Sequence, residues 1–230
     1  MTKSRLFWGI VAPPAAIVNS LLFVYIILKI RGVEPIEMFK LMISYGFDPR
    51  NLVSEINQTL AYYMAGVAAA IGFKMLLFNI GIDGQYRMGA FFGAVVGAAV
   101  TLPPILHVLL IIVTAMLAGG IWAAIAGYLK VKRGVNEVIS NIMLNFIAAA
   151  IIAFLLSPNL LGSLPEGSQN LQTKPIPASG QMPTIKAFDG EIYSFIFVAI
   201  FVGIAYWVML NKTVFGFNLR ATGLYFRAAR

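Results

Sequence analysis

FNIGIDGQ, residues 78–85, separates two apolar runs, one that ends near Phe73 and one that begins at Met88. It gathers two glycines, two amides and a carboxylate in a chain that is otherwise mostly hydrocarbon. Gly81 and Gly84 are expected to let the backbone turn, because a residue without a Cβ tolerates positive φ. Such a break inside a bilayer requires protein or water to satisfy the freed backbone groups. The sequence therefore predicts a broken helix at 78–85.

The composition places the whole chain in a membrane. Of its 230 residues, 60% are hydrophobic and 11% are charged, and the mean hydropathy is +0.84. Soluble domains carry about 25% charged residues. Only helices and closed barrels span bilayers, and the apolar runs here are long and do not alternate. We predict an all-α fold, a polytopic transmembrane helical bundle forming a single domain over residues 1–230.

The apolar runs divide into six predicted spans. Residues 88–129 contain no charge, and as one helix they would measure about 63 Å, so we expect the chain to fold back at the prolines 103–104. Gly89, Gly93 and Gly97 form a doubled GxxxG pattern, which favours tight helix contact. The spans cover about 6–28, 52–73, 88–102, 105–129, 138–157 and 192–210. Residues 158–190 are predicted to be an external loop, and 212–230 a cytoplasmic segment.

The distribution of charge predicts the orientation. With the N-terminus inside, the inner segments hold Asp83, Arg87 and most of the other basic residues, whereas the outer segments hold most of the acids. Cytoplasmic loops are enriched in Lys and Arg. We expect a multi-pass protein of the inner (plasma) membrane with both termini in the cytoplasm.

The sequence lacks the residues that several classes of function require. The sequence has no cysteine, a lone histidine (His107, expected at the membrane interface) and no GxxxxGK[ST] nucleotide-binding motif. It offers no Ser/His/Asp or Cys/His set for catalysis. The net charge of +8 comes without the basic patches, interleaved with aromatics, that bind nucleic acid. We therefore predict no enzyme activity, catalytic residue, metal, cofactor or nucleic-acid partner.

The segment 78–85 permits two interpretations. It could form a tight cytoplasmic hairpin in which the Asp83 carboxylate caps the next helix. It could instead be a discontinuous helix whose N–H groups and polar side chains face a solute, as in many transporters. The residues alone leave both open.

A second motif is GVNEVISNIMLN, residues 134–145. Asn136 or Ser140 could cap a helix, and Glu137 would sit in its first turn. Asn141 and Asn145 are four residues apart and share one helical face. Their amides could bond across helices or line a polar route for a sugar or nucleoside.

A third motif is FGFNLRATGLYFRAAR, residues 215–230, in which Gly216 and Gly223 are expected to bracket a turn. It could be a basic tail held by anionic membrane lipid. It could also be a short cytoplasmic helix that docks on a soluble partner through arginines such as Arg220.

In this order and at these separations, the three motifs resemble the permease subunits of bacterial ABC importers. The resemblance is to the branch that handles nucleosides and simple sugars, related to the ribose and branched-chain amino-acid permeases. It covers nearly the whole chain. It implies import of a nucleoside or simple sugar, with ATP hydrolysed on a separate ATPase subunit.

The resemblance also implies partners and site residues. The partners are the ABC ATPase subunit, an identical or paralogous second permease subunit, and an extracytoplasmic substrate-binding protein. The expected substrate pathway comprises Asn79, Asp83, Gln85, Asn141 and Asn145. The expected ATPase-coupling residues are Gly216, Arg220, Gly223, Ala228 and Ala229.

The chain departs from the family pattern in three respects. The family usually has glutamate where Asp83 stands, and often an Asn-Pro turn where this chain has Tyr225 and Phe226. Family members continue through further spans after the coupling segment, so we expect this chain to be a partial permease.

Two other classes of function stay open from the sequence. One is an ion-coupled secondary transporter of a small polar solute that uses Asp83 or Glu137 as its coupling group. The other is a membrane scaffold that transports nothing.

Overall fold

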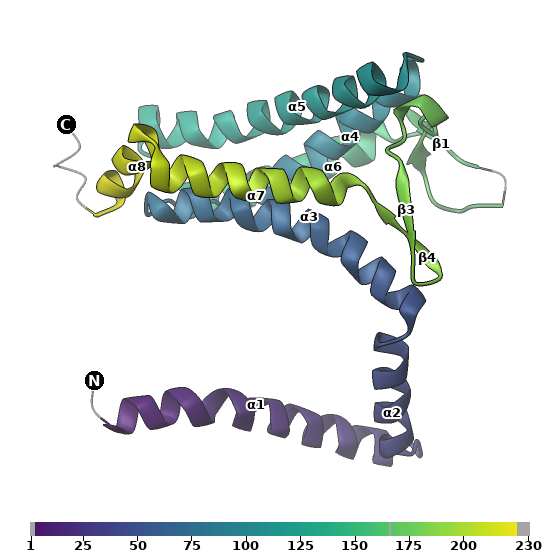
Figure 1. Ribbon diagram of the computed structural model, residues 1–230, viewed down its shortest axis with the longest axis vertical. Coiled ribbons are helices and arrows are strands. Elements are labelled where there is room, and N and C mark those ends of the chain that lie inside the picture. The colour runs from purple at the N-terminus through teal and green to yellow at the C-terminus, as the bar shows by residue number, and fades with distance from the viewer. Residues whose placement is uncertain (1–2, 166, 225–230) are drawn as a thin grey trace. The chain divides into compact units, whose positions relative to one another are not determined.

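Helices dominate the computed structural model, which describes residues 3–165 and 167–224 (Figure 1). The eight α-helices of these residues are α1 (Lys3–Ile30), α2 (Pro35–Gly46), α3 (Pro49–Lys74), α4 (Ile82–Ala99), α5 (Pro104–Arg133), α6 (Glu137–Leu155), α7 (Phe195–Lys212) and α8 (Val214–Leu224). Short strands pair as β1 (Gly162–Ser163) with β2 (Gln172–Thr173), and as β3 (Thr184–Ala187) with β4 (Gly190–Tyr193). The predicted helical character is confirmed.

Four of these helices are long and apolar enough to cross a membrane: the Val11–Ile30 part of α1, α5, α6 and α7. Helices α3 and α4 cover the predicted spans 52–73 and 88–102, but they are less apolar. Asp83 and Arg87 stand in the first turns of α4, before its apolar part. The total of six spans therefore stays a prediction.

Large apolar side chains cover the outside of α5. Ile105 is 84% exposed, Met116 70% and Ile121 66%. In water such a surface would favour aggregation, whereas against acyl chains it costs nothing. The exposed apolar surface thus agrees with the membrane location that the composition predicts.

The chain divides into two compact units, of which the first comprises residues up to Glu55 together with 187–190. An ion pair of 2.8 Å joins Lys29 at the end of α1 to Glu34 just before α2. Pro35 occupies the first turn of α2, where its missing N–H has no helical partner to lose. Val53 of α3 packs on Gly190, where a Cβ would lie 3.0 Å from the valine side chain.

The second unit comprises residues 56–186 and those from Glu191 onward, and α4 and α5 form its closest helix pair. A Cβ on Gly89 would lie 2.8 Å from the Ala115 carbonyl oxygen, and one on Gly97 would lie 2.8 Å from Ile111 Cδ1. The glycines therefore allow the two backbones to approach, which confirms the function predicted for the doubled GxxxG pattern.

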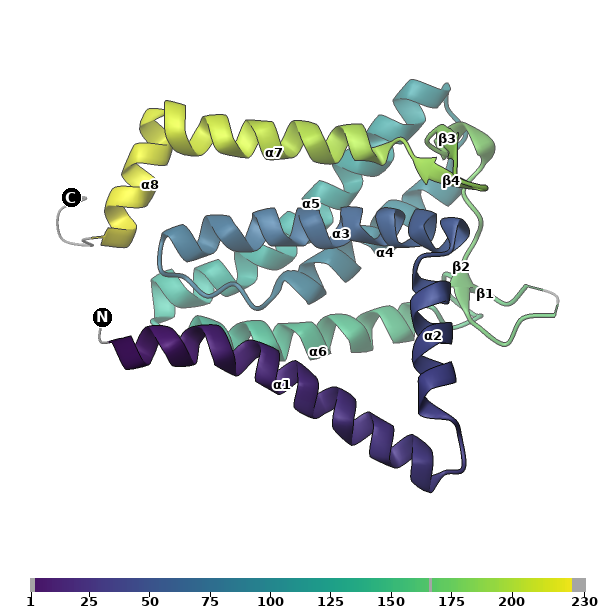
Figure 2. The same cartoon turned by 60° about the horizontal axis from the view of Figure 1, so that its bottom comes forward.

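Helix α3 is fixed at two points within this unit. Near its start, the Asn57 side chain donates to the Glu191 carbonyl and accepts from the Tyr193 N–H, both at 2.9 Å, and so extends β4. Further along, the Tyr63 hydroxyl meets Gly203 of α7 where only a glycine leaves room. Beyond α7 the chain turns sharply into α8 (Figure 2).

His107, near the start of α5, is fully buried within the protein, and its expected place at the membrane interface stays a prediction. Its Nε2 lies 2.9 Å from the Gly97 carbonyl oxygen near the end of α4, and its Nδ1 lies 2.8 Å from Ser179 Oγ. Ser179 belongs to a short 3₁₀ turn (Ala178–Gly180) in the segment predicted as an external loop. The imidazole ring, which belongs to α5, thus links this loop to the end of α4.

Candidate functional site

The connection between α3 and α4 comprises residues 75–81, of which Leu76, Phe78 and Ile80 have exposed side chains. A Cβ on Gly119 would lie 3.0 Å from the Gln85 carbonyl oxygen. Gly119 precedes the end of α5 by about 14 residues, or roughly 21 Å of helix. The start of α4 therefore lies beside the middle of α5, while Gly81 lies against Asn141, four residues after the start of α6. The discontinuous helix stays a prediction. The break spans 75–81 rather than 78–85, because α4 already begins at Ile82.

Close packing, not a left-handed backbone, explains the glycines of this segment. Neither Gly81 nor Gly84 has a positive φ, so the predicted reason for them is wrong. A Cβ on Gly81 would overlap the side chain of Asn141, and one on Gly84 would lie 2.7 Å from Asn145 Oδ1. The bare backbone lets two amides of α6 reach the start of α4.

Asn145 bonds the backbone that the break leaves open. Its Oδ1 accepts from the Gly84 N–H at 2.9 Å, and its Nδ2 donates to the Ile80 carbonyl at 3.0 Å. Irregular backbone needs such substitutes wherever water is excluded. The Asn145 side chain thus links the 75–81 connection and the start of α4 to α6.

Asn79 and Gln85 form a second amide link across the start of α4. The Asn79 Nδ2 donates to Gln85 Oε1 at 3.3 Å, and Gln85 Nε2 donates back to Asn79 Oδ1 at 3.1 Å. The same Asn79 oxygen also accepts from the Gly81 N–H at 3.2 Å. Two side chains predicted for the substrate pathway therefore bond to each other.

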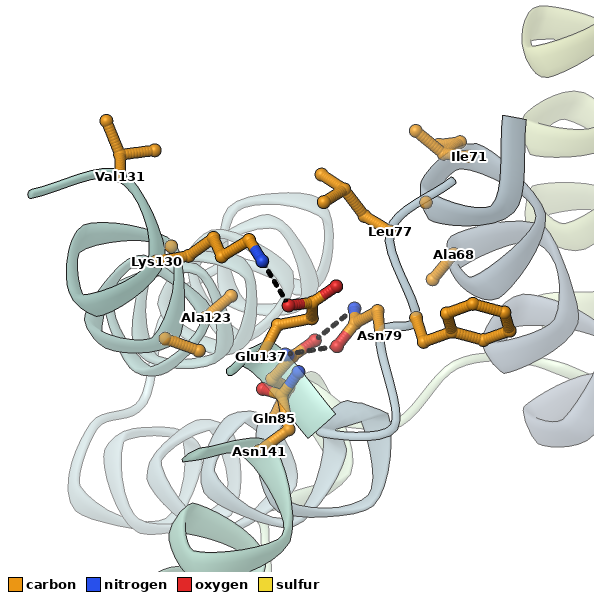
Figure 3. A pocket seen from close by; sticks show the side chains of 14 residues that line it. Ala68, Ile71, Leu77, Asn79, Gln85, Ala123, Lys130, Val131, Glu137 and Asn141 are labelled. Carbon is orange, nitrogen blue, oxygen red and sulfur yellow. Dashed lines mark hydrogen bonds and ion pairs between the residues drawn. The ribbon is translucent and has the colours of Figure 1, made fainter. Parts of the chain in front are cut away.

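A cavity of about 280 Å³ opens beside this amide pair (Figure 3). It is walled by α3, the 75–81 connection, α5 and α6, and Asn79, Gln85 and Asn141 supply its amides. Asn141 is 4% exposed, and its Oδ1 has no hydrogen-bond partner among the described residues. Free polar capacity in a cavity of this kind is typical of ligand sites.

An ion pair borders the same cavity. Lys130 Nζ lies 2.6 Å from Glu137 Oε2, and the glutamate side chain is 18% exposed (Figure 3). Asn136 caps α6 by accepting from the Val138 N–H at 2.9 Å, as predicted, and this places Glu137 in the first turn. Gly134, at φ +65°, ends α5 in the left-handed conformation that the short α5–α6 turn requires.

Asp83 lies apart from the cavity. Instead of capping α4, its two carboxylate oxygens each accept from Arg87 Nε at 2.9 Å. Both side chains line a recess against Asn145 and Phe146 in the middle of α6. The charge count assigned Arg87 to the inner segments, and the structure shows that it stands in the first turns of α4. The i,i+4 spacing from Asp83 was the signal that could have identified the pair.

The expected coupling residues lie partly within α8. Gly216 and Gly223 stand inside this helix instead of bracketing a turn, and the turn itself precedes Val214. Gly216 is buried against the last carbonyls of α7, and Gly223 meets the Lys74 carbonyl. Arg220 is half-buried on the same helix. Ala228 and Ala229 lie outside the described residues.

Similarity to known proteins agrees with this arrangement. The family described as "Branched-chain amino acid transport system / permease component" matches residues 51–230. The guanosine ABC transporter permease NupP of Bacillus subtilis is 34% identical over 73% of this chain and 48% of its own length. No solved structure gives a significant match.

Two further relatives are more distant. The glucose ABC transporter permease TsgB13 of Haloferax volcanii is 29% identical over 86% of this chain and 54% of its own length. The nucleoside ABC transporter permease NupB of Lactococcus lactis is 26% identical over 94% of this chain and 61% of its own length. The chain spans about half the length of these relatives. It belongs to the family of branched-chain amino acid transport system permease components.

Proposed function

We propose that this chain forms part of the membrane permease of an ATP-driven importer that carries nucleosides or simple sugars across the inner membrane. The observation that carries the proposal is the 75–81 connection, an irregular segment between α3 and α4 whose Ile80 carbonyl accepts from the Asn145 amide of α6. Transporter sites use interrupted helices of this kind. Amide groups suit uncharged solutes, whose hydroxyls and ring nitrogens they can bond.

The proposed pathway has two polar surfaces. Asn79, Gln85 and Asn141 border the cavity, whereas Asp83 and Asn145 border the recess on the other side of the α4 start. Six spans with both termini in the cytoplasm would place the connection between the second and third spans, and with it both surfaces, toward the cytoplasmic side. The relatives named as guanosine, nucleoside and glucose permeases support the choice of solute class.

The energy would come from a separate ATPase that docks on α8 and the residues after it. Gly216, Arg220 and Gly223 lie on that helix, and Ala228 and Ala229 follow it in the sequence. A second permease subunit and an extracytoplasmic binding protein would complete the importer. The contact of Gly223 with Lys74 gives the ATPase a direct mechanical route to the 75–81 connection.

Uptake in proteoliposomes tests the proposal. The full-length gene product, reconstituted with its ATPase and binding protein, should accumulate a radiolabelled nucleoside or sugar only when ATP is present. Asp83→Ala should lower uptake while the complex still assembles. Uptake driven by a proton or sodium gradient without the ATPase would instead favour a secondary transporter, and no flux of any solute would favour a scaffold.

A further inference from the structure

A charged pair in the first turns of α4 lies half exposed beside the middle of α6. The Asp83 side chain is 56% exposed and that of Arg87 is 54% exposed. They border Phe146, which follows the start of α6 by about nine residues, or roughly 14 Å. Charged side chains beside the middle of an apolar helix such as α6 do not face acyl chains without a large cost. This face of α4 and α6 therefore borders water or protein in the working transporter.

Two adjoining recesses run along this face. One has a volume of about 310 Å³ and the other about 340 Å³, and both are lined by Arg87 and Ala149. Together they form what we call the α4–α6 groove. From α4 it is lined by Asp83, Tyr86, Arg87 and Ala90, which have the spacing of a single helical face.

The groove offers a ligand hydrogen-bond donors, hydrogen-bond acceptors and aromatic rings. Arg87 uses only its Nε–H on Asp83, so its terminal N–H groups can still donate. Each Asp83 oxygen keeps a lone pair that can accept. Two aromatic rings stand beside the pair, with Tyr86 56% exposed and Phe146 70% exposed.

A purine base with a 6-oxo group matches this set. In guanine, O6 and N7 accept two hydrogen bonds from one arginine. The adjoining N1–H and 2-amino groups can donate to a carboxylate, and the flat ring stacks on aromatic side chains. A simple sugar offers hydroxyls but has no extended π-face and no separate donor and acceptor edges.

We propose that the α4–α6 groove is a selectivity site for 6-oxopurine nucleosides. Arg87 binds the O6/N7 edge, Asp83 binds the N–H edge, and Tyr86 and Phe146 hold the ring. The inference rests on the proposed importer function and narrows its solute class. It also assigns to Arg87 a direct contact with the solute.

The test compares two nucleosides in the complete importer, reconstituted with one ATPase and one binding protein throughout. Guanosine carries the 6-oxo and 2-amino groups, whereas purine riboside lacks both. Arg87→Gln should lower the ratio of guanosine uptake to purine riboside uptake by about tenfold, the effect of losing one bidentate contact. Arg133→Gln, which changes an exposed arginine at the end of α5, is the matched control and should leave the ratio unchanged.

A second pair of variants tests the stacking. Tyr86→Leu should lower uptake of both nucleosides by about tenfold, within the range of one lost base stack. Tyr128→Leu, at an exposed tyrosine of α5 outside the groove, should have no effect. Because the first readout is a ratio within one variant, a lower amount of folded complex does not change it.

Each outcome separates this inference from the proposed function. ATP-dependent nucleoside uptake with an unchanged ratio in Arg87→Gln would overturn the inference alone. Uptake of ribose or glucose without any nucleoside would overturn it too, while the importer function stands. Absence of ATP-dependent uptake of every solute would overturn both.

Discussion

Gly223 of α8 lies so close to Lys74 at the end of α3 that a Cβ on the glycine would overlap the lysine carbonyl oxygen. The same Cβ would lie 3.4 Å from the Cα of Met75, the first residue of the interruption. The helix proposed to meet the ATPase thus touches the segment proposed to meet the solute.

Gly223→Val should uncouple α8 from the 75–81 connection. The added side chain forces α8 away from the end of α3, at a cost of about 1–3 kcal/mol, typical of overpacking. We expect ATP-driven uptake to fall at least fivefold while the permease and ATPase still co-purify. Gly120→Ala, at an exposed helical glycine with open space around it, is the control for the loss of a glycine. Normal uptake by Gly223→Val would show that this contact transmits nothing.

Arg220→Glu should weaken the association of the ATPase. Arg220 is half-buried on α8, and reversing its charge would put repulsion where the proposed interface has a cation. We expect the yield of co-purified ATPase to drop severalfold, with the drop growing smaller at high salt. Lys132→Glu, on the exposed end of α5, tests whether any lost cation has the same effect. Equal yields for wild type and Arg220→Glu would exclude the contact.

Asn145→Leu should destabilise the whole bundle. It leaves the buried Gly84 N–H without its partner, at a cost of about 1–3 kcal/mol, and removes the bond to the exposed Ile80 carbonyl. Thermal unfolding of the purified protein in detergent should show a fall in Tm of several degrees. Asn211→Leu is the matched control, because Asn211 bonds only to its own helix, at Trp207. A Tm equal to that of wild type would mean that these two bonds do not hold the interruption.

Gly81→Ala should be rescued by a change in Asn141. The new methyl group would overlap the asparagine side chain, so Gly81→Ala alone should lower Tm. Asn141→Ala removes the obstacle together with an oxygen that has no partner among the described residues. In a double-mutant cycle, the pair should therefore be more stable than the two separate losses predict. Additive losses would refute the direct contact.

The pattern along the chain predicted much of the helical part. Apolar runs and paired prolines located the helices to within a few residues, and the spacing of Gly89, Gly93 and Gly97 identified a contact face because helical periodicity is local. Asn136 was recognisable as a cap for the same reason. Each of these features depends on neighbours in sequence.

The site itself depends on tertiary contacts and was less predictable. Gly81 and Gly84 looked like turn residues, since nothing local shows that two asparagines from α6 press on them. Arg87 fell outside the predicted span 88–102, although its i,i+4 spacing from Asp83 indicates that both stand in one helix, α4. The burial of His107 could not be foreseen either, because Ser179, which bonds it, lies 72 positions away.

Helix α4 is held at both extremities, by Asn145 at its beginning and by the imidazole of His107 near its end. Between these anchors its glycines lie flush on α5. Helix α4 cannot slide or tilt by itself without breaking one of these two hydrogen bonds. In the proposed importer, any movement of α4 would therefore either carry α5 and α6 with it or break one of the bonds. A movement that begins at Asn145, at the start of α4, would therefore be transmitted along the helix to His107 near its end.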